Sequence, residues 1–246
     1  MPNQPPNNQH AEKMRTLIII PAYNEAGHIG RVIQELRSTC PSFDLLVIND
    51  NSSDATFTQA KAEGAHVVSL PYNLGIGGAM QTGFQYARSH GYAFAVQLDG
   101  DGQHDPRYIR DILTPLYNQD YNLCIGSRFL DTKGFQSSLL RRLGIRFFSW
   151  LISNLSGQHT SDPTSGFRAA DQRAIALFAG DYPVDFPEPE SIVIAKRAGC
   201  RIGEVPVIMR NRFGGHSSIR FLKSGYYMLK VTIAIILCVL RKKEVK

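Results

Sequence analysis

Apolar and polar positions alternate along the first 130 residues in a unit that occurs four times. Each unit has a short apolar run, a polar loop, and then apolar residues spaced three and four positions apart, as on one face of a helix. The four apolar runs are TLIIIP from Thr16, FDLLVIND from Phe43, AHVVSL from Ala65 and YAFAVQL from Tyr92. Strands that alternate with helices predict an α/β fold, in which a mostly parallel sheet is flanked by helices on both faces.

The pattern is less regular after a further predicted strand, NLCIGSR, at residues 122–128. Residues 137–155 combine arginines with many large apolar residues, which indicates an amphipathic basic helix that faces either the protein core or a lipid surface. The remaining expected elements are a loop at 161–169, a helix from Asp171, a helix over 192–199 preceded by the segment DFPEPES, and a strand over 201–209.

The C-terminal end contains an apolar run from Val231 to Leu240, which is closed by Arg241, Lys242 and Lys243. A transmembrane helix needs about 20 such residues, so this run is too short to span a bilayer alone. The pattern favours an amphipathic membrane-associated helix that lies at the interface. A C-terminal helix packed on the domain, or a chain that ends before membrane spans, fits the same residues.

Composition restricts the setting of the protein. The 246 residues, 43% of them hydrophobic, suit one α/β domain. The first residues, MPNQPPNNQHAEKM, are polar and lack the apolar centre of a signal peptide, so they predict a flexible tail. Cys40, Cys124, Cys200 and Cys238 form no CxxC pair and have mostly apolar neighbours, which indicates reduced, buried thiols in a cytoplasmic protein.

The net charge of +6 is divided unevenly along the chain. Residues 1–130 carry 9 basic and 12 acidic residues, whereas residues 131–246 carry 18 and 9. A basic second half favours a phosphate-bearing or membrane-surface partner. Nucleic acid is least favoured, because the basic residues accompany apolar helices and not an aromatic-studded sheet.

Three aspartates crowd into the residues QLDGDGQHDP, at the end of the fourth apolar run. An EF-hand loop starting at Asp99 would have Gly and Glu at its sixth and twelfth positions, but these are His104 and Arg110. The carboxylates of Asp99 and Asp101, beside glycines that allow a ligand to approach, suit Mg²⁺ or Mn²⁺ shared with phosphates. A plain turn is the alternative.

Two other loops follow predicted strands. Asp50 ends the second apolar run, where an acceptor for a base or ribose would lie, and Ser53 or Asp54 after it suits a helix N-cap. The glycine-rich NLGIGGA, residues 73–79, opens a helix and could present N–H groups to a phosphate or sugar. It lacks the GK[ST] of a P-loop and the final glycine of GxGxxG.

Taken together, PAYNE, INDNSSDAT, NLGIGGA and DGDGQHDP resemble, in this order and spacing, the nucleotide-sugar-binding half of the family 2 inverting glycosyltransferases. The likeness covers residues 16–130 and implies the GT-A fold. It also implies that the donor is bound by Pro21, Tyr23, Glu25, Asp50, Gly77 and Asp99.

Within that set, the resemblance assigns finer roles. Asp50 would contact the uracil or guanine, Asp99 the ribose or a metal, and Asp101 the metal that bridges the diphosphate. Many relatives carry an aspartate where this chain has Asn49. That departure leaves the base contact open.

Short motifs in the second half resemble the polyprenyl-phosphate glycosyltransferases, a subgroup that includes dolichyl-phosphate mannose synthases and bacterial undecaprenyl-phosphate sugar transferases. The motifs are GSR at 126–128, the pair Arg141-Arg142, TSGFR at 164–168 and RNRFGGHSS at 210–218. The QxxRW motif of relatives that glycosylate a hydroxyl does not occur.

This subgroup resemblance implies that Gln103 joins Asp99 and Asp101 at an Mg²⁺ or Mn²⁺ ion. The acceptor would be bound by Ser127, Arg128, Arg142 and Arg212, of which the three arginines hold phosphates and, with Asp101, form the catalytic set. Ser218 stands where relatives usually carry lysine, which leaves one phosphate contact open.

A lipid phosphate is anionic at neutral pH, so its attack on an anomeric carbon needs charge neutralisation and in-line positioning but no general base. We therefore expect a metal-dependent inverting glycosyltransferase that moves a sugar from a nucleoside diphosphate to a polyprenyl phosphate. UDP-glucose and UDP-N-acetylglucosamine are the favoured donors. The expected place is cytoplasmic, peripheral on the inner face of the cell membrane, with a small membrane protein as a further partner.

The chain is therefore expected to divide into a tail at 1–14, a catalytic domain at 15–218 and an interfacial segment at 219–246. The catalytic domain is expected to have a nucleotide-sugar half, 15–130, and an acceptor half, 131–218.

Two other functions stay open. One is a GT-A transferase to a sugar hydroxyl in polysaccharide synthesis, with Glu190 or Asp185 as base. The other is a non-catalytic nucleotide-sugar-binding membrane adaptor. Glu188 could also bind sugar hydroxyls, whereas His104, His159 and His216 are assigned no role.

Overall fold

The chain is described by a computed structural model over residues 14–131, 139–210 and 221–240, without the side chains of 139–141 and 221–227. One seven-stranded sheet has the order β3-β2-β1-β4-β6-β5-β7. The strands are β1 (Thr16–Ala22), β2 (Asp44–Asn49), β3 (His66–Ser69), β4 (Phe94–Gln97), β5 (Leu123–Ser127), β6 (Arg168–Asp171) and β7 (Ile202–Pro206). Neighbours are parallel except at β6, which is antiparallel to β4 and β5, so the expected mostly parallel sheet is confirmed.

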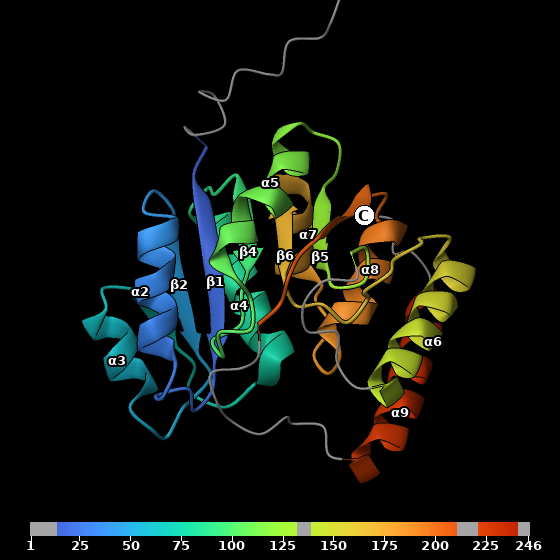
Figure 1. Cartoon of the computed structure of the whole chain (residues 1–246), viewed down its shortest axis with the longest axis horizontal. Helices are drawn as coiled ribbons and strands as arrows, with labels where there is room; N and C mark the ends of the chain where they lie inside the picture. Colours follow the sequence, from blue (N-terminus) through green and yellow to red (C-terminus); the bar gives the residue numbers. More distant parts are fainter. Residues whose placement is uncertain (1–13, 132–138, 211–220, 241–246) are drawn as a thin grey trace, which may run out of the picture.

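Helices cover both faces of the sheet, as expected (Figure 1). One face carries α2 (Ile29–Thr39), α3 (Thr56–Ala62) and α5 (Ile109–Tyr117), the last preceded by the short 3-10 helix η1 (Pro106–Tyr108). The other face carries α4 (Gly75–Ser89), α6 (Leu139–Ser156), α7 (Gln172–Gly180), α8 (Pro187–Arg197) and α9 (Phe221–Leu240).

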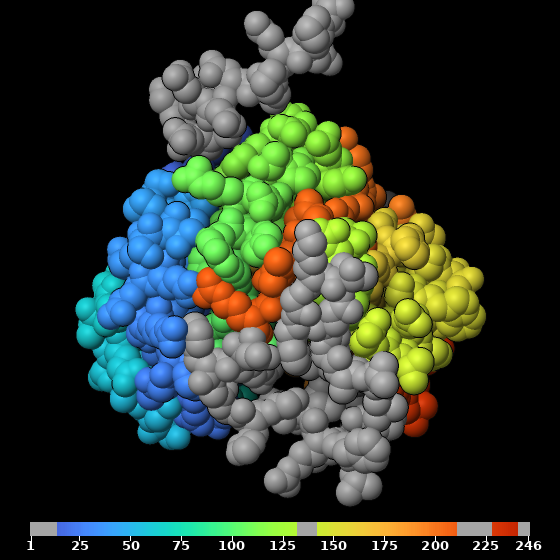
Figure 2. Space-filling model, in the orientation of Figure 1, coloured from blue at the N-terminus to red at the C-terminus, as the bar shows by residue number. Residues whose placement is uncertain are grey.

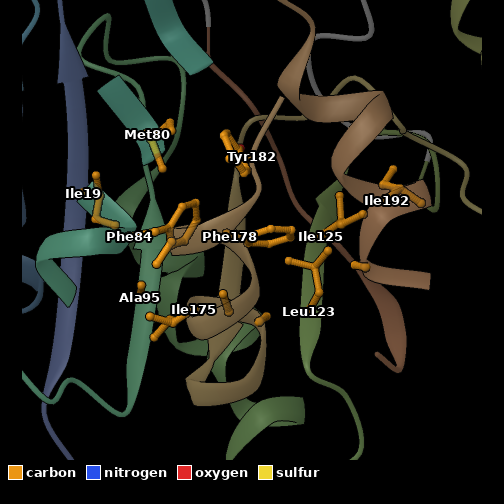
Figure 3. Packing of buried hydrophobic residues seen from close by; sticks show 14 of the residues in the cluster. Ile19, Met80, Phe84, Ala95, Leu123, Ile125, Ile175, Phe178, Tyr182 and Ile192 are labelled. Atoms are coloured by element: carbon orange, nitrogen blue, oxygen red, sulfur yellow. The ribbon is translucent and has the colours of Figure 1, made fainter. Parts of the chain in front are cut away.

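Both faces of the central strands are buried, which explains their continuous apolar runs. Side chains alternate along a strand, so Ile18 and Ile20 pack under α2 while Ile19 packs on the opposite face with α4. On that opposite face, Phe84 of α4 and Phe178 of α7 meet at a ring-centroid distance of 5.2 Å (Figure 3). This aromatic contact joins two helices of the layer to each other.

Two elements differ from the sequence prediction. The loop expected over 161–169 gives way to β6 at Arg168, and this strand, RAAD, has no β-branched residue that would have announced it. Helix α8 begins at Pro187, five residues before the expected 192, because proline is compatible with the first turn of a helix. Glu188 and Glu190 therefore lie in a helical first turn and not in a connecting segment.

The direction of β6 decides what reaches the functional edge of the sheet. The carboxyl ends of β1, β2, β4 and β5 share one edge, from which their loops emerge. Because β6 runs the other way, its first residue, Arg168, pairs with Gln97 at the end of β4. The TSGFR segment is thereby brought beside the acidic loop, residues 99–105.

Helices α6 and α9 lie side by side at one flank of the molecule (Figure 1). In α9, Val231 and Ile235 are fully buried against the domain, whereas another side of the helix exposes apolar residues. The domain-packed alternative thus describes one face of α9, and a membrane-associated helix is not demonstrated. No helix among the residues described is long and apolar enough to cross a membrane.

Four regions with sequence predictions lie outside the described residues. They are the tail at 1–13, the segment 132–138 that includes the start of the helix expected over 137–155, the segment 211–220 that includes Arg212 and Ser218, and the basic end at 241–246. All four cysteines are described and free of disulfides; Cys40, Cys124 and Cys200 are buried and Cys238 is partly buried.

Candidate active site

The acidic loop is held by a histidine that sequence reasoning had set aside. The Asp99 N–H donates to Nδ1 of His104 at 3.1 Å, so the neutral ring carries its proton on Nε2. That Nε2 lies 3.7 Å from Oδ2 of Asp99. His104 is buried and stacks on Phe167 with a centroid distance of 5.0 Å, and these contacts fix the backbone and carboxylate of Asp99.

Asp101 and Gln103 are joined in a tight turn. Oδ1 of the buried Asp101 accepts the N–H of Gln103 at 2.9 Å, and Gly102 between them has a φ of 77° that favours glycine. Carboxylate and amide oxygens, which Asp101 and Gln103 bring to this turn, are ligands of the hard type that Mg²⁺ and Mn²⁺ prefer.

The residues present fit a divalent cation that is coordinated partly by the protein and partly by a phosphate-bearing substrate. Among the described residues, no group of three His, Cys, Asp or Glu side chains is arranged to hold a metal alone. Asp99, Asp101 and Gln103 would supply part of the coordination shell, and diphosphate oxygens commonly complete such shells. A Cβ on Gly166 would lie 3.3 Å from both carboxylate oxygens of Asp99, so this glycine keeps the space beside Asp99 open.

Asp50 organises the glycine-rich loop. The residue is 3% exposed, and its carboxylate oxygens accept the N–H groups of Leu74 at 2.7 Å and Gly75 at 2.9 Å. A carboxylate has lone pairs for further donors, so a base contact is compatible with this role. Asn49, the departure noted above, donates to Ser69 Oγ at 3.0 Å and ties β2 to β3.

The first two loops are bound to each other and abut the acidic loop. The Glu25 N–H donates to Thr56 Oγ1 at 2.8 Å, and Asp54 accepts the N–H groups of both Ala26 and Thr56. A Cβ on Gly100 would lie 3.5 Å from the carbonyl oxygen of Pro21 and 3.7 Å from Cγ of Glu25.

The other two predicted donor residues lie differently. Tyr23 is 52% exposed on the same first loop. Gly77 has a packing role: a Cβ there would overlap the carbonyl oxygens of Pro183 and Val184. The structure therefore brings the first, second and acidic loops together, and places Gly77 under a neighbouring backbone.

Arg128 lies in a buried ion pair. Its Nε and Nη2 donate to the two carboxylate oxygens of Asp162 at 2.7 and 2.8 Å, and Nη2 also donates to Thr164. The side chains are 6% and 0% exposed. Nη1 is then the edge of the guanidinium that could meet a phosphate. Asp162 was not singled out in the sequence, because only the fold brings it to Arg128.

Ser127 belongs to the same buried network. Its Oγ lies 2.6 Å from Oγ of Ser161, whose N–H donates to Glu204 of β7 at 2.7 Å. Glu204 also accepts the N–H of Asp162 at 3.0 Å. Burial raises the pKa of the Glu204 carboxyl, and these N–H groups oppose the shift. The network fixes the loop after β5 against the TSGFR region.

Arg142 lines a cavity of about 510 Å³ between α6 and the loops at 129 and 159–161. Arg146, one helical turn further along α6, lines the same cavity, which also has an apolar wall. The lining residues are Phe129, Arg142, Ile145, Arg146, Ser149, Trp150, Ser153, Asn154, His159 and Ser161. Two guanidinium groups beside apolar side chains suit an anionic head group with an apolar tail.

The acids of the PEPE segment have unusual surroundings. Burial raises the pKa of Glu188, and the guanidinium of buried Arg168 opposes this shift. Burial and the nearby Asp185 raise the pKa of Glu190 to about 7, against the effect of Lys230 of α9. Lys230 itself lies 3.0 Å from Asp185.

A sequence profile described as Glycosyl transferase family 2 matches residues 17–178. The chain belongs to this family. Undecaprenyl-phosphate mannosyltransferase of Micrococcus luteus is 33% identical over 228 residues, covering 89% of this chain and 93% of the relative. UDP-N-acetylglucosamine–dolichyl-phosphate N-acetylglucosaminyltransferase of Methanococcus voltae is 30% identical over 214 residues, covering 77% and 83%.

Solved structures of glucosyl-3-phosphoglycerate synthase from Mycobacterium tuberculosis share the fold of this family 2 glycosyltransferase. One, in complex with Mn²⁺, UDP and glucosyl-3-phosphoglycerate, has a TM-score of 0.72 at 21% identity and covers 97% of this chain and 86% of that one. The prediction of a GT-A-like fold and of glycosyltransferase activity is thereby confirmed.

Proposed function

We propose that this enzyme transfers a sugar from a nucleoside diphosphate to a polyprenyl phosphate in one inverting displacement at a membrane surface. The observation that carries the proposal is that one segment borders both sites: Ser161 lines the cavity with Arg142 and Arg146, and Gly166, five residues later, lies beside the carboxylate of Asp99. The relatives named above, which act on undecaprenyl or dolichyl phosphate, support this acceptor class.

On the donor side, Asp50 and the first loop would bind the nucleoside, with Pro21, Tyr23 and Glu25 at its pocket. Asp99, Asp101 and Gln103 would hold Mg²⁺ or Mn²⁺, which when bound stabilises the charge of the departing diphosphate. Solved structures of the glucosyl-3-phosphoglycerate synthase contain Mn²⁺ or Mg²⁺ with UDP, which supports this cofactor class.

On the acceptor side, Arg142 would bind the lipid phosphate, and Arg212 and the Nη1 edge of Arg128 are proposed as further phosphate ligands. These guanidinium groups would neutralise and align an anion that is already nucleophilic, so no proton has to be removed from it. Ser127 would position the loop that carries Arg128. The apolar wall of the cavity, which includes Trp150, would receive the first part of the lipid tail.

The exposed apolar residues of α6 and α9 support a peripheral place on the membrane. Figure 2 shows α6 on the right flank of the molecule, with part of α9 beside its lower end. The exposed residues are Leu143, Phe147, Trp150 and Leu155 of α6 and Leu229, Ile233, Ile236, Leu237 and Leu240 of α9. They would enter the inner leaflet, or cover a small membrane protein, next to the acceptor cavity.

The donor sugar is proposed as glucose or N-acetylglucosamine on UDP. The named relatives transfer mannose and N-acetylglucosamine, so the sugar varies within the family. The test incubates the full chain with Mg²⁺ or Mn²⁺, a panel of nucleotide sugars and undecaprenyl phosphate, and detects lipid-linked sugar by mass. Transfer to free sugars or polysaccharide, with none to the lipid phosphate, would reject the proposal.

One observation favours a second function, transfer to a sugar hydroxyl. A base must lose its proton near neutral pH, and the pKa of Glu190 is raised to about 7. If Glu190 is a base, Glu190→Gln abolishes transfer. If the acceptor is a lipid phosphate, the same variant keeps most of its activity.

A further inference from the structure

The backbone that follows β7 runs along the acidic loop. The Arg210 N–H donates to the carbonyl oxygen of Gln103 at 2.9 Å, and Met209 forms an antiparallel bridge with His104. The acidic loop is therefore supported from β4, where it begins, and from the residues after β7. These two supports are far apart in the chain and are joined only by folding.

The guanidinium of Arg210 connects this arrangement to a third segment. Its Nη2 lies 2.8 Å from Oδ1 of Asp105, at the end of the acidic loop, and its Nη1 lies 2.5 Å from Oε1 of Glu35 in α2. The Asp105 side chain is 2% exposed and that of Arg210 is 28% exposed, so this contact is screened less by solvent and salt than a pair of fully exposed charges.

A second arginine, Arg107, also binds the carboxylate of Asp105, but its contacts are local. Arg107 binds both carboxylate oxygens, but it lies two residues further in the same turn and is 75% exposed. Its contacts stay within one turn, whereas those of Arg210 join the acidic loop, α2 and the segment after β7. The two arginines thus form a matched pair around one carboxylate.

We propose that Arg210 is a positioning residue for the metal site. Its backbone N–H holds the Gln103 carbonyl oxygen, and its guanidinium fixes that backbone against Asp105 and Glu35, so that Asp101 and Gln103 keep the arrangement that receives a divalent cation together with the donor diphosphate. Because Asp101 accepts the Gln103 N–H, a shift of Gln103 displaces both groups. This inference rests on the proposed function, which assigns Asp101 and Gln103 to the cation.

The test measures binding and not turnover. Mn²⁺ is titrated into the full chain with UDP or GDP, the Mn²⁺ affinity is followed by electron paramagnetic resonance, and nucleotide affinity with and without Mn²⁺ by calorimetry. Arg210→Met is expected to weaken Mn²⁺ binding roughly tenfold or more, the usual effect of losing a group that orients metal ligands. Nucleotide affinity without Mn²⁺ should stay unchanged, whereas general damage to the fold would lower both.

Arg107→Met is the control, since it removes the other guanidinium from the same carboxylate, and it should keep wild-type Mn²⁺ affinity. Equal losses in both variants, or none in Arg210→Met, would overturn the inference. Should Arg210→Met not fold, Glu35→Gln removes the anchor in α2 and must show the same Mn²⁺-specific loss. A wild-type chain without Mn²⁺-dependent nucleotide binding would instead reject the proposed function itself.

Discussion

The carboxylate of Asp50 holds the N–H groups of Leu74 and Gly75, and the guanidinium of Arg128 holds Asp162. Both residues were expected to face ligands, and the structure gives each a protein partner first. A buried charge requires such a partner, because desolvation without one is costly. At the scale of single residues, the charges of this site therefore serve the fold as well as the proposed chemistry.

The Arg128–Asp162 pair predicts a contrast in stability. Arg128→Met leaves a buried carboxylate without its main cation, which is expected to lower the free energy of unfolding by about 3–5 kcal/mol. Arg142→Met, at the cavity, should change it by no more than about 0.5 kcal/mol while raising the KM for the lipid phosphate. Urea unfolding and acceptor titrations measure the two effects. Equal stabilities would contradict a structural role for Arg128.

Asp101 offers a test of the metal site. Asp101→Asn keeps an oxygen that can accept the Gln103 N–H but removes the negative charge from the cation. The affinity for Mn²⁺ should fall by about 10–100-fold. Turnover and Mn²⁺-dependent nucleotide binding should fall with it. Asp120→Asn, at an exposed position, is the control and should match the wild type. Full Mn²⁺ affinity in Asp101→Asn would remove Asp101 from the site.

At the scale of elements, small residues and titratable groups set how the helices pack. Gly77 lets α4 pass directly under the backbone of Pro183 and Val184. Between α8 and α9, Lys230 pairs with Asp185 while Glu190 is half-buried nearby. These contacts hold the helix layer that carries α9, next to the flank with the cavity lined by Arg142 and Arg146.

The packing of α4 predicts a strong effect of one methyl group. In Gly77→Ala the new Cβ would overlap backbone oxygens that cannot rotate away, so stability should fall by about 1–3 kcal/mol or more. Gly180→Ala adds the same group at a position with nothing within 4 Å and should be neutral. Thermal unfolding of both variants measures the difference, and similar midpoints would show that the α4 contact can relax.

The Glu190 carboxyl predicts a pH dependence of stability. Its folded pKa of about 7 lies above the ordinary 4.5, so the folded state binds the proton more tightly. The resulting contribution of Glu190 to the free energy of unfolding is fully present below pH 4.5 and is lost as the pH rises towards 7. The urea midpoint should therefore fall between pH 5 and pH 8, and fall less in Glu190→Gln. An identical fall in both proteins would exclude Glu190 as the source.

At the scale of the whole molecule, the α6–α9 flank and the carboxyl edge of the sheet would define the orientation of the enzyme at a membrane surface. The chain has a single tryptophan, Trp150, and it is 60% exposed on α6. If this flank meets a bilayer, the donor loops remain in water while the acceptor cavity lies near the lipid. The molecule would then collect its two substrates from two phases.

Trp150 reports on this orientation directly. Its fluorescence should shift to shorter wavelength when anionic vesicles are added, because the indole would leave water for the interface. Leu237→Ser, on the exposed face of α9, should weaken vesicle binding. Val184→Ser is the control, because Val184 is also exposed but lies outside α6 and α9, and this variant should bind vesicles as the wild type does. Fluorescence and vesicle co-sedimentation that do not change with lipid would contradict a membrane-facing flank.

The sequence by itself determined the α/β class, the four strand–loop–helix units and the position of the acidic loop, because periodic burial and short motifs are local properties. Tertiary structure alone decided the antiparallel β6, the pairing of Arg128 with Asp162, the support of Asp99 by His104 and the span of Arg210 from α2 to the acidic loop. These contacts join residues from separate elements or depend on how a loop closes, and no local pattern encodes such geometry.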